Sequence, residues 1–321
     1  MECTCIAITG ASGFVGGRLV RALALRSEIE VRALVRHGPP PYVTDDRRLT
    51  IVRGDMVDPS VLTQLLRPGC TVANFAYDGA SSADSNLAAG RALADASANC
   101  GVTRIVHCST AVVVGNTPAT RIDETTACNP TTDYEKTKLA IENLLRDKAR
   151  GKFEFTALRP TAVFGPGGRN LLKMAHDLIT NSRVTNYLRS CLNDDRRLHL
   201  VDVDNVVAAV EFLLTTQRPL DGETFIVVDD DAPENNYRAV EQFLMHALAI
   251  SDYRTPRVVA PASFLSLLLR LRGRSLRARD TVFVADKLSS LGFIKPVAFA
   301  AGIARFADWY KYTHAIEAGP A

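Results

Sequence analysis

The feature that most constrains the fold of this chain is a glycine-rich turn near its N-terminus, Gly10-Ala11-Ser12-Gly13-Phe14-Val15-Gly16. An apolar run at residues 4–8 precedes the turn, and apolar residues at helical spacing, 14–25, follow it. Gly10 permits a tight turn, Gly13 lets a pyrophosphate approach the backbone, and Gly16 lets the helix pack closely on the sheet. N–H groups at the start of that helix then bind phosphate oxygens. The turn predicts a dinucleotide-binding unit lined by Gly10, Ser12, Gly13, Phe14, Val15 and Gly16, rather than an ordinary strand–helix connection.

Strand and helix patterns alternate through the first half of the chain. We expect strands at residues 4–8, 31–35, 49–52, 70–75, 104–108 and 153–158, and helices at 14–25, 61–66, 86–99 and 133–150. Such alternation gives right-handed crossovers and a parallel sheet covered by helices on both faces. The predicted fold class is therefore α/β, a Rossmann-type doubly wound parallel sheet.

The alternation loosens after about residue 160. A loop rich in Pro and Gly occupies residues 160–168, and the expected elements that follow are helices at 171–180, 203–214, 239–249, 262–271 and 298–312 and strands at 198–201 and 224–228. We expect a dinucleotide-binding domain over residues 1–160 and a smaller α/β lobe, mainly for the substrate, over 161–321. The segment of about 198–228 is expected to return to the first domain.

Length and charge exclude several classes of protein. At 321 residues the chain is long enough to bury a substantial core without staples. Its 38 basic and 35 acidic residues give a net charge of +3, so we expect a small-molecule substrate and no nucleic acid. The first residues lack the basic flank and apolar core of a signal peptide, and no apolar run is long enough to span a bilayer. We expect a cytoplasmic protein.

The cysteines and histidines follow no ligand spacing. All seven Cys and all six His are dispersed along the chain, without a CxxC pair. We therefore assign no metal site and expect the cysteines to be ordinary reduced thiols.

An apolar stretch that becomes basic lies at residues 264–279. Such a stretch can rest on an anionic membrane surface. We favour a helix of the second lobe with an exposed basic end.

The end of the second expected strand distinguishes the two nicotinamide dinucleotides. NAD-binding sites usually place Asp or Glu there, whereas NADP needs a cation for its 2′-phosphate. This chain has Arg36, whose planar guanidinium can make a forked contact to phosphate, although a solvated arginine is the alternative. Asp55 and Met56 follow the third strand, and Ala76 and Tyr77 follow the fourth, at the edge of the sheet where ligands bind. We predict NADP, with NAD as the alternative.

A second group of residues points to proton transfer. Thr110 follows the fifth strand, and Tyr134 and Lys138, four residues apart, lie on one face of the helix at 133–150. A neighbouring ammonium lowers the pKa of a phenol, which then exchanges a proton with a carbinol or ketone. The Y-x-x-x-K pattern is common by chance, but its place after the glycine turn and Thr110 favours a catalytic set.

Taken together, these motifs resemble the extended short-chain dehydrogenase/reductases, of the group called the NAD-dependent epimerase/dehydratase family. Further matches are Ser109-Thr110-Ala111-Val112-Val113-Val114-Gly115, Arg159-Pro160-Thr161-Ala162-Val163-Phe164-Gly165-Pro166 and Val203-Asp204-Asn205-Val206. The resemblance covers nearly the whole chain. It implies a Rossmann domain, a nicotinamide cofactor and a Thr110, Tyr134 and Lys138 catalytic set. It also implies a homodimer formed through the helices that contain Asn86 and Lys138.

Departures from that family bear on the substrate. Many members that act on nucleotide sugars have Tyr where this chain has Val114, and Asn where it has Ala162. Arg197 stands near the position of a diphosphate-binding Arg in that group, although a solvated charge cluster with the neighbouring aspartates is the alternative. Besides Thr110, we take Phe164 and Arg197 as candidate substrate contacts.

The resemblance implies an NAD(P)-dependent oxidoreductase that transfers hydride at a CHOH/C=O carbon. A nucleotide-linked sugar is the leading substrate class, with 4-epimerisation or 4-ketoreduction as the reaction. The alternative is an NADPH-dependent reductase or dehydrogenase of an apolar ketone or alcohol, of the hydroxysteroid dehydrogenase or dihydroflavonol reductase type. A regulatory protein that binds the dinucleotide without turnover, and a membrane-surface scaffold, are two further alternatives that these motifs disfavour.

Overall fold

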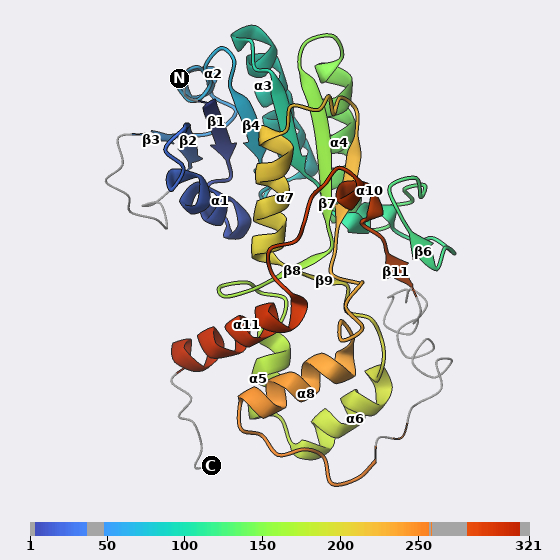
Figure 1. Ribbon diagram of the computed structural model, residues 1–321. Coiled ribbons are helices and arrows are strands. Elements are labelled where there is room, and N and C mark those ends of the chain that lie inside the picture. The colour runs from blue at the N-terminus through green and yellow to red at the C-terminus, as the bar shows by residue number, and fades with distance from the viewer. Residues whose placement is uncertain (1–3, 37–47, 257, 259–280, 315–321) are drawn as a thin grey trace.

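A seven-stranded, fully parallel sheet forms the centre of the computed structural model, which describes residues 4–36, 48–256, 258 and 281–314 (Figure 1). The strands lie in the order β3 (Leu49–Arg53), β2 (Ile29–Val35), β1 (Thr4–Thr9), β4 (Thr71–Asn74), β5 (Arg104–Cys108), β7 (Glu154–Pro160) and β10 (Thr224–Val227). The predicted doubly wound α/β fold is confirmed. Chain order runs outward from β1 in both directions, so a crevice opens where β1 meets β4.

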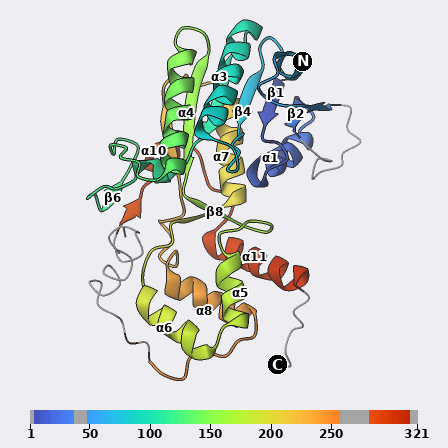
Figure 2. The ribbon, with the colours of Figure 1, turned by 180° about the vertical axis from the view of Figure 1, so that it is seen from behind.

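Helices cover both faces of this sheet. One face carries α1 (Phe14–Ala24) and α7 (Val203–Thr215), and the other carries α2 (Pro59–Leu65), α3 (Ala83–Cys100) and α4 (Asp133–Ala149) (Figures 1 and 2). Each face has its own apolar core, because strands buried on both sides present side chains alternately to the two layers. The burial of these cores holds the strand ends, and the loops that follow them, in fixed positions.

Polar side chains join three neighbouring strands just beneath the crevice. The Thr9 hydroxyl donates to Asn74 Oδ1 at 2.6 Å, and the Asn74 amide meets His107 Nδ1 at 3.1 Å. All three side chains are buried, and burial together with the nearby Lys138 keeps the pKa of His107 well below its ordinary value. The imidazole is therefore neutral, and its Nδ1 accepts a hydrogen bond from the amide. This chain of hydrogen bonds ties β1, β4 and β5 together where the crevice opens.

The second lobe lies below the carboxyl edge of the sheet and is mostly helical. It contains α5 (Leu172–Thr180), α6 (Arg183–Asn193), α8 (Tyr237–Ala247) and α11 (Phe299–Thr313), with the short pair β8 (Ala162–Phe164) and β9 (Leu200–Asp202) above them (Figure 1). The smaller elements are η1 (Ala111–Val114), β6 (Arg121–Ile122), β11 (Val282–Phe283) and α10 (Asp286–Ser290). We did not expect α6, and β8 lies within the predicted loop at 160–168. Both differences have a tertiary cause, because β8 is extended by pairing with β9 and α6 packs on α8.

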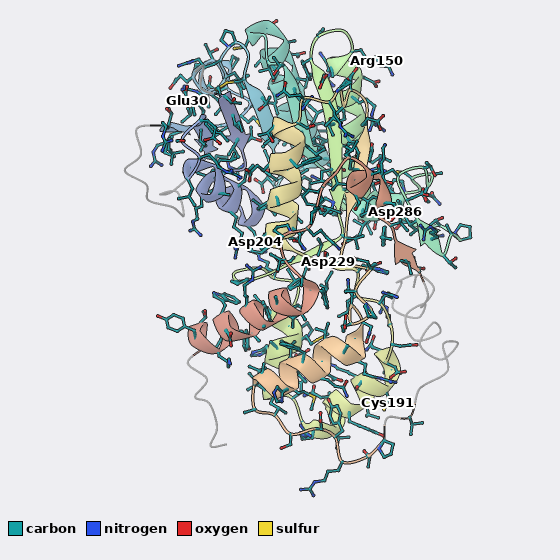
Figure 3. The ribbon with its side chains drawn as sticks, in the orientation of Figure 1. Glu30, Arg150, Cys191, Asp204, Asp229 and Asp286 are labelled. Atoms are coloured by element: carbon teal, nitrogen blue, oxygen red, sulfur yellow. A yellow bond between two sulfur atoms is a disulfide. The ribbon has the colours of Figure 1, made fainter. Side chains whose placement is uncertain are left out.

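Charged side chains connect the two lobes. Asp202 caps α7 and is fully buried, and it accepts two hydrogen bonds from Arg305 of α11 at 2.8 and 2.9 Å. Asp204, on the first turn of α7, pairs with Arg305 and also with Arg18 of α1 at 3.1 Å. Figure 3 shows Asp204 and Asp229 at the level where the sheet meets the lower helices. These ion pairs fix α11 and the helices below it relative to the glycine turn.

The prediction that all cysteines are reduced is wrong for one pair. Cys5 of β1 and Cys70, which precedes β4, form a disulfide with a Cα–Cα distance of 4.7 Å. Ile6 pairs with Thr71 in the sheet, so the preceding residues face each other across the same two strands. The spacing of the cysteines in the sequence gives no sign of this pairing, because the partners lie 65 positions apart. The bridge lies at the amino end of the strands, opposite the crevice.

Three further expectations concern a segment near the C-terminus, membrane-spanning helices and metal sites. The expected helix at 262–271 and the whole apolar and basic stretch at 264–279 lie outside the residues that the structure describes. Within the described ranges, no helix combines the length and apolar character that crossing a bilayer requires. The same residues contain no cluster of three or more His, Cys, Asp or Glu side chains suited to a metal.

Two helical glycines with opposite surroundings test the packing. A Cβ at Gly302 of α11 would overlap the Asp202 carboxylate, whereas one at Gly90 of α3 would meet Ile141 at an ordinary 3.5 Å. Gly302→Ala should therefore lower the free energy of unfolding by about 1–3 kcal/mol although alanine favours helix. Gly90→Ala should raise it by up to about 1 kcal/mol. Urea unfolding followed by circular dichroism measures both, and equal stabilisation by the two substitutions would contradict the packing described here.

Candidate active site

The first turn of α4 is held rigidly by its own cap. The Thr132 hydroxyl accepts from Glu135 N at 3.3 Å, and the Glu135 carboxylate accepts from Thr132 N at 3.1 Å. This reciprocal capping box satisfies N–H groups that a helix start otherwise leaves unpaired. It fixes the position of Tyr134 on the first turn and of Lys138 one turn later.

Lys138 is buried beneath the crevice. Its Nζ donates to the carbonyl of Cys108, at the end of β5, at 2.7 Å and lies 5.3 Å from the centre of the Tyr77 ring. Burial lowers the pKa of Lys138, while Cys108 and Glu142 oppose that shift. The ammonium thus joins the start of α4 to the ends of β4 and β5.

Tyr134 lies at the surface of the same crevice, with 44% of its area exposed and its ring edge-on to Tyr77 at 5.3 Å. Burial of the hydroxyl end raises the pKa of Tyr134, and the hydrogen bond with Thr110 opposes the rise. From the Tyr134–Lys138 spacing we expect the ammonium to lower that pKa. The structure differs, because desolvation has the largest effect on the Tyr134 hydroxyl and the ammonium donates to Cys108 O.

Thr110 lies between the end of β5 and the start of η1. It is buried and caps η1, since its hydroxyl accepts from Val112 N at 3.4 Å. The Thr110 side chain lowers the pKa of Tyr134, and both residues line the same cleft at the carboxyl end of the sheet. A carbonyl or carbinol oxygen between them would contact both groups, which is the geometry that proton exchange requires.

A cleft of about 990 Å³ runs from the glycine turn to these side chains, and we call it the catalytic cleft. Its lining includes Gly10, Ser12, Gly13, Phe14, Val15, Gly16, Tyr77, Thr110, Tyr134 and Lys138. Arg18, Arg21 and Arg169 also line it, and none of the described residues in this lining is acidic. The cleft therefore favours a ligand that carries negative charge.

A second cleft, of about 680 Å³, continues from the glycine turn on the far side of β1. We call it the adenosine cleft, and its lining includes Gly10, Ser12, Gly13, Arg36, Asp55, Met56, Ala76 and Tyr77. Arg36 makes a specific contact in addition to its contact with solvent, because its guanidinium donates to Asp78 Oδ2 at 2.8 Å. The Asp55 carboxylate accepts from Val57 N at 3.1 Å, which shapes the loop after β3.

The glycine turn fits a bound dinucleotide. Gly10 has φ +65°, and a Cβ there would lie 2.8 Å from the carbonyl carbon of Phe75, so only glycine allows this close approach. A Cβ at Gly16 would overlap the backbone of Gly10, which keeps α1 close to β1. The two clefts meet at this turn, in front of the N-terminus of α1. A pyrophosphate at the turn would therefore connect a nicotinamide in the catalytic cleft with an adenosine in the other.

A buried ion pair fixes α4 to the sheet behind these residues. Glu142, one turn after Lys138, is fully buried and accepts from Arg159 of β7 at 2.7 and 3.1 Å. Arg146 donates to the same carboxylate at 3.0 Å. The two-pronged contact to Arg159 holds the pKa of Glu142 below its usual range despite burial.

The structure does not bring two predicted substrate contacts to either cleft. Phe164 is fully buried and packs edge-on against Phe299 at 5.7 Å. Arg197 donates to the carbonyl of Asp230 at 2.9 Å. Neither residue is in the lining of the catalytic cleft or the adenosine cleft.

Sequence reasoning also missed residues that the clefts contain. Thr161 follows β7, is buried, and has a hydroxyl without a hydrogen-bond partner in the described part of the chain. The rule that ligands meet the carboxyl ends of strands would have found it. Arg169 and Asp78 lie in loops, where no spacing pattern marked them.

Comparisons with known proteins agree with this geometry. The family model described as "NAD dependent epimerase/dehydratase family" matches residues 6–227. The chain is 26% identical over 283 residues to "Sterol demethylase protein B" of Methylococcus capsulatus, covering 83% of this chain and 80% of that protein. It is 27% identical over 327 residues to a dTDP-glucose 4,6-dehydratase of Streptomyces antibioticus, covering 95% and 91%.

The fold is also shared with solved structures. The dTDP-glucose 4,6-dehydratase DesIV of Streptomyces venezuelae, solved with NAD and TYD bound, superimposes with a TM-score of 0.73 at 22% identity, covering 97% of this chain and 98% of that one. Other structural neighbours were likewise solved with NAD. Since the family model matches well over half of the sequence, this chain belongs to the NAD-dependent epimerase/dehydratase family.

Proposed function

We propose that the protein transfers hydride at a CHOH/C=O carbon of a nucleotide-linked sugar, as a 4-epimerase or 4-ketoreductase. The observation that carries the proposal is the convergence of Thr110, Tyr134 and Lys138 in one cleft beside the glycine turn. A bound nicotinamide dinucleotide supplies the hydride donor and acceptor.

In this proposal each of the three side chains has a separate task. Burial raises the pKa of Tyr134, so its phenol keeps its proton at neutral pH and is suited to donate it to a ketone oxygen. Thr110 hydrogen-bonds the same oxygen and orients it. Lys138, held by Cys108 O, contributes positive charge beneath the cleft and hydrogen-bonds the nicotinamide ribose.

The charge of the catalytic cleft supports a substrate with a diphosphate. Arg18, Arg21 and Arg169 belong to its lining, which has no acidic member among the described residues. A relative named as a dTDP-glucose 4,6-dehydratase also aligns along 95% of this chain. In this proposal, Arg169 from the loop after β8 takes the place of the absent Arg197 contact, and Arg18 contributes only by leaving its ion pair with Asp204.

A second candidate is an apolar ketone or alcohol, handled by a reductase or dehydrogenase of the same family. The observation that favours it is the alignment with "Sterol demethylase protein B" along 83% of this chain. Val114 and Ala162 also stand where many nucleotide-sugar members have polar Tyr and Asn.

A direct assay separates the two substrate classes. We expect the protein to turn over UDP- or dTDP-hexoses. The sugar product should be detected by chromatography, because an epimerisation without net redox change leaves the nicotinamide absorbance unchanged. Steroid and aromatic ketones, followed by NADPH absorbance, should give no turnover. Activity on the ketones alone would replace the first proposal by the second.

Tyr134→Phe tests the proton-transfer role. It should lower kcat at least about a hundredfold, because general acid–base catalysis by a positioned side chain contributes on that order. Dinucleotide affinity should stay nearly unchanged, since the hydroxyl alone is removed. Tyr312→Phe is the matched control, because Tyr312 is 90% exposed on α11. Wild-type turnover by Tyr134→Phe would reject the assignment.

We also propose NADP as the preferred dinucleotide, with NAD as the alternative. Arg36 lines the adenosine cleft at the end of β2, where a 2′-phosphate would lie. Structural neighbours were solved with NAD, so the preference rests on this arginine alone.

Arg36→Ala is expected to weaken NADPH roughly ten- to a hundredfold and to leave NADH nearly unchanged, because a charge-assisted contact contributes roughly 1.5–3 kcal/mol. Fluorescence titration of both reduced dinucleotides measures the affinities. Arg150→Ala is the control, since Arg150 pairs with Asp147 on the exposed end of α4. Equal affinities of the unaltered protein for NADPH and NADH would overturn the preference.

We further propose that the protein forms a homodimer and that each subunit divides into two domains. α3 and α4 lie side by side on one face of the sheet, which supports a homodimer that packs these helices from two subunits (Figure 2). The pairing of β10 with β7 supports a first domain over residues 1–160 that regains the segment of about 198–228, with the rest of 161–321 as the substrate lobe.

A further inference from the structure

The loop between β4 and α3 presents a carboxylate to the arginine on which the NADP preference rests. Asp78 Oδ2 accepts from Arg36 at 2.8 Å, and both residues line the adenosine cleft. The two side chains follow the ends of β4 and β2, which lie on opposite sides of β1. A phosphate that binds Arg36 must therefore displace this carboxylate or bind beside it.

Local hydrogen bonds keep Asp78 in place. Its carboxylate accepts from Ala80 N at 3.0 Å and from the Ser81 hydroxyl at 2.9 Å. Asn86 of α3 bonds both the N–H and the carbonyl of Asp78, each at 2.9 Å. The carboxylate is thus anchored by the loop, whereas Arg36 reaches it on a long side chain that is 46% exposed.

The charge of Asp78 persists over the physiological pH range. The Arg36 guanidinium and the Ala80 and Ser81 donors lower the pKa of Asp78 to about 2. A 2′-phosphate on Arg36 would consequently lie close to a full negative charge, and like charges at that spacing reduce affinity. The 2′-hydroxyl of NAD brings no such charge.

We propose that Asp78 is a cofactor-specificity residue, which holds Arg36 in an ion pair and so lowers the affinity for dinucleotides that carry a 2′-phosphate. NADH binds with the ion pair intact, and NADPH binds after Arg36 leaves it. The inference rests on the proposed contact between Arg36 and the 2′-phosphate. The inference predicts that the ratio of NADPH affinity to NADH affinity is smaller than it would be if Arg36 acted without Asp78.

Asp78→Asn tests the inference with the loop preserved, because the amide oxygen can still accept from Ala80 N while the amide nitrogen donates to the Ser81 hydroxyl. The variant should bind NADPH about tenfold more tightly and NADH unchanged. Calorimetric titration with 2′,5′-ADP and with 5′-AMP should give the same contrast, since these ligands fill the adenosine cleft alone. Asp308→Asn is the matched control, as it removes an exposed carboxylate from an ion pair with Lys311 on α11.

Combining Asp78→Asn with Arg36→Ala separates the inference from the function on which it rests. The gain in NADPH affinity should disappear in the double variant. If Arg36→Ala weakens NADPH but Asp78→Asn changes nothing, the inference fails and the NADP proposal stands. If Arg36→Ala leaves NADPH unchanged, the NADP proposal itself fails. A loss of NADH affinity in Asp78→Asn would assign the carboxylate to the ribose hydroxyl and overturn the inference.

Discussion

The ion pair between Glu142 and Arg159 is the contact on which the geometry of the candidate active site depends. Both side chains are buried, so the two hydrogen bonds between them form where water cannot replace them. Removing one partner of such a pair typically costs about 3–5 kcal/mol, because the other charge stays buried. The pair fixes α4 to β7, and α4 carries Tyr134 and Lys138 on the same face. The capping box then fixes the free end of that helix.

The parts of the fold that sequence predicts are those that local chemistry determines. The glycine turn, the alternating strands and the Tyr134–Lys138 spacing each depend on a few neighbouring residues, and the sheet agrees with them. β8 was missed because it is extended only through its distant partner β9. The same holds for Cys5 and Cys70, whose meeting depends on the register of two strands. Sequence spacing carries no information on such contacts.

The candidate site shows the same limit at the level of single side chains. The lining of the catalytic cleft contains the glycine turn, Thr110, Tyr134 and Lys138, which the turn motif, the end of the fifth strand and the helical spacing predict. Phe164 and Arg197 were selected by analogy of position, and the structure uses them for packing and for a carbonyl contact. The expected lowering of the Tyr134 pKa also depended on where one flexible ammonium points. A carbonyl oxygen 2.7 Å from Lys138 Nζ determines that direction, and carbonyl positions follow from the backbone fold rather than from residue type.

The disulfide has a topological consequence for ligand binding. The bridge between Cys5 and Cys70, 65 positions apart, closes a loop that contains the glycine turn, Arg36, Asp55 and Met56. In the chain-entropy account, closing a loop of that length lowers the conformational entropy of the unfolded chain and so stabilises the folded state by about 4 kcal/mol. The segment that carries the glycine turn and the loops after β2 and β3 is therefore a covalent ring, closed at the end of the strands farthest from the crevice. Oxidation of this pair therefore restricts the unfolded ensemble of the ring through a bond that lies away from the crevice.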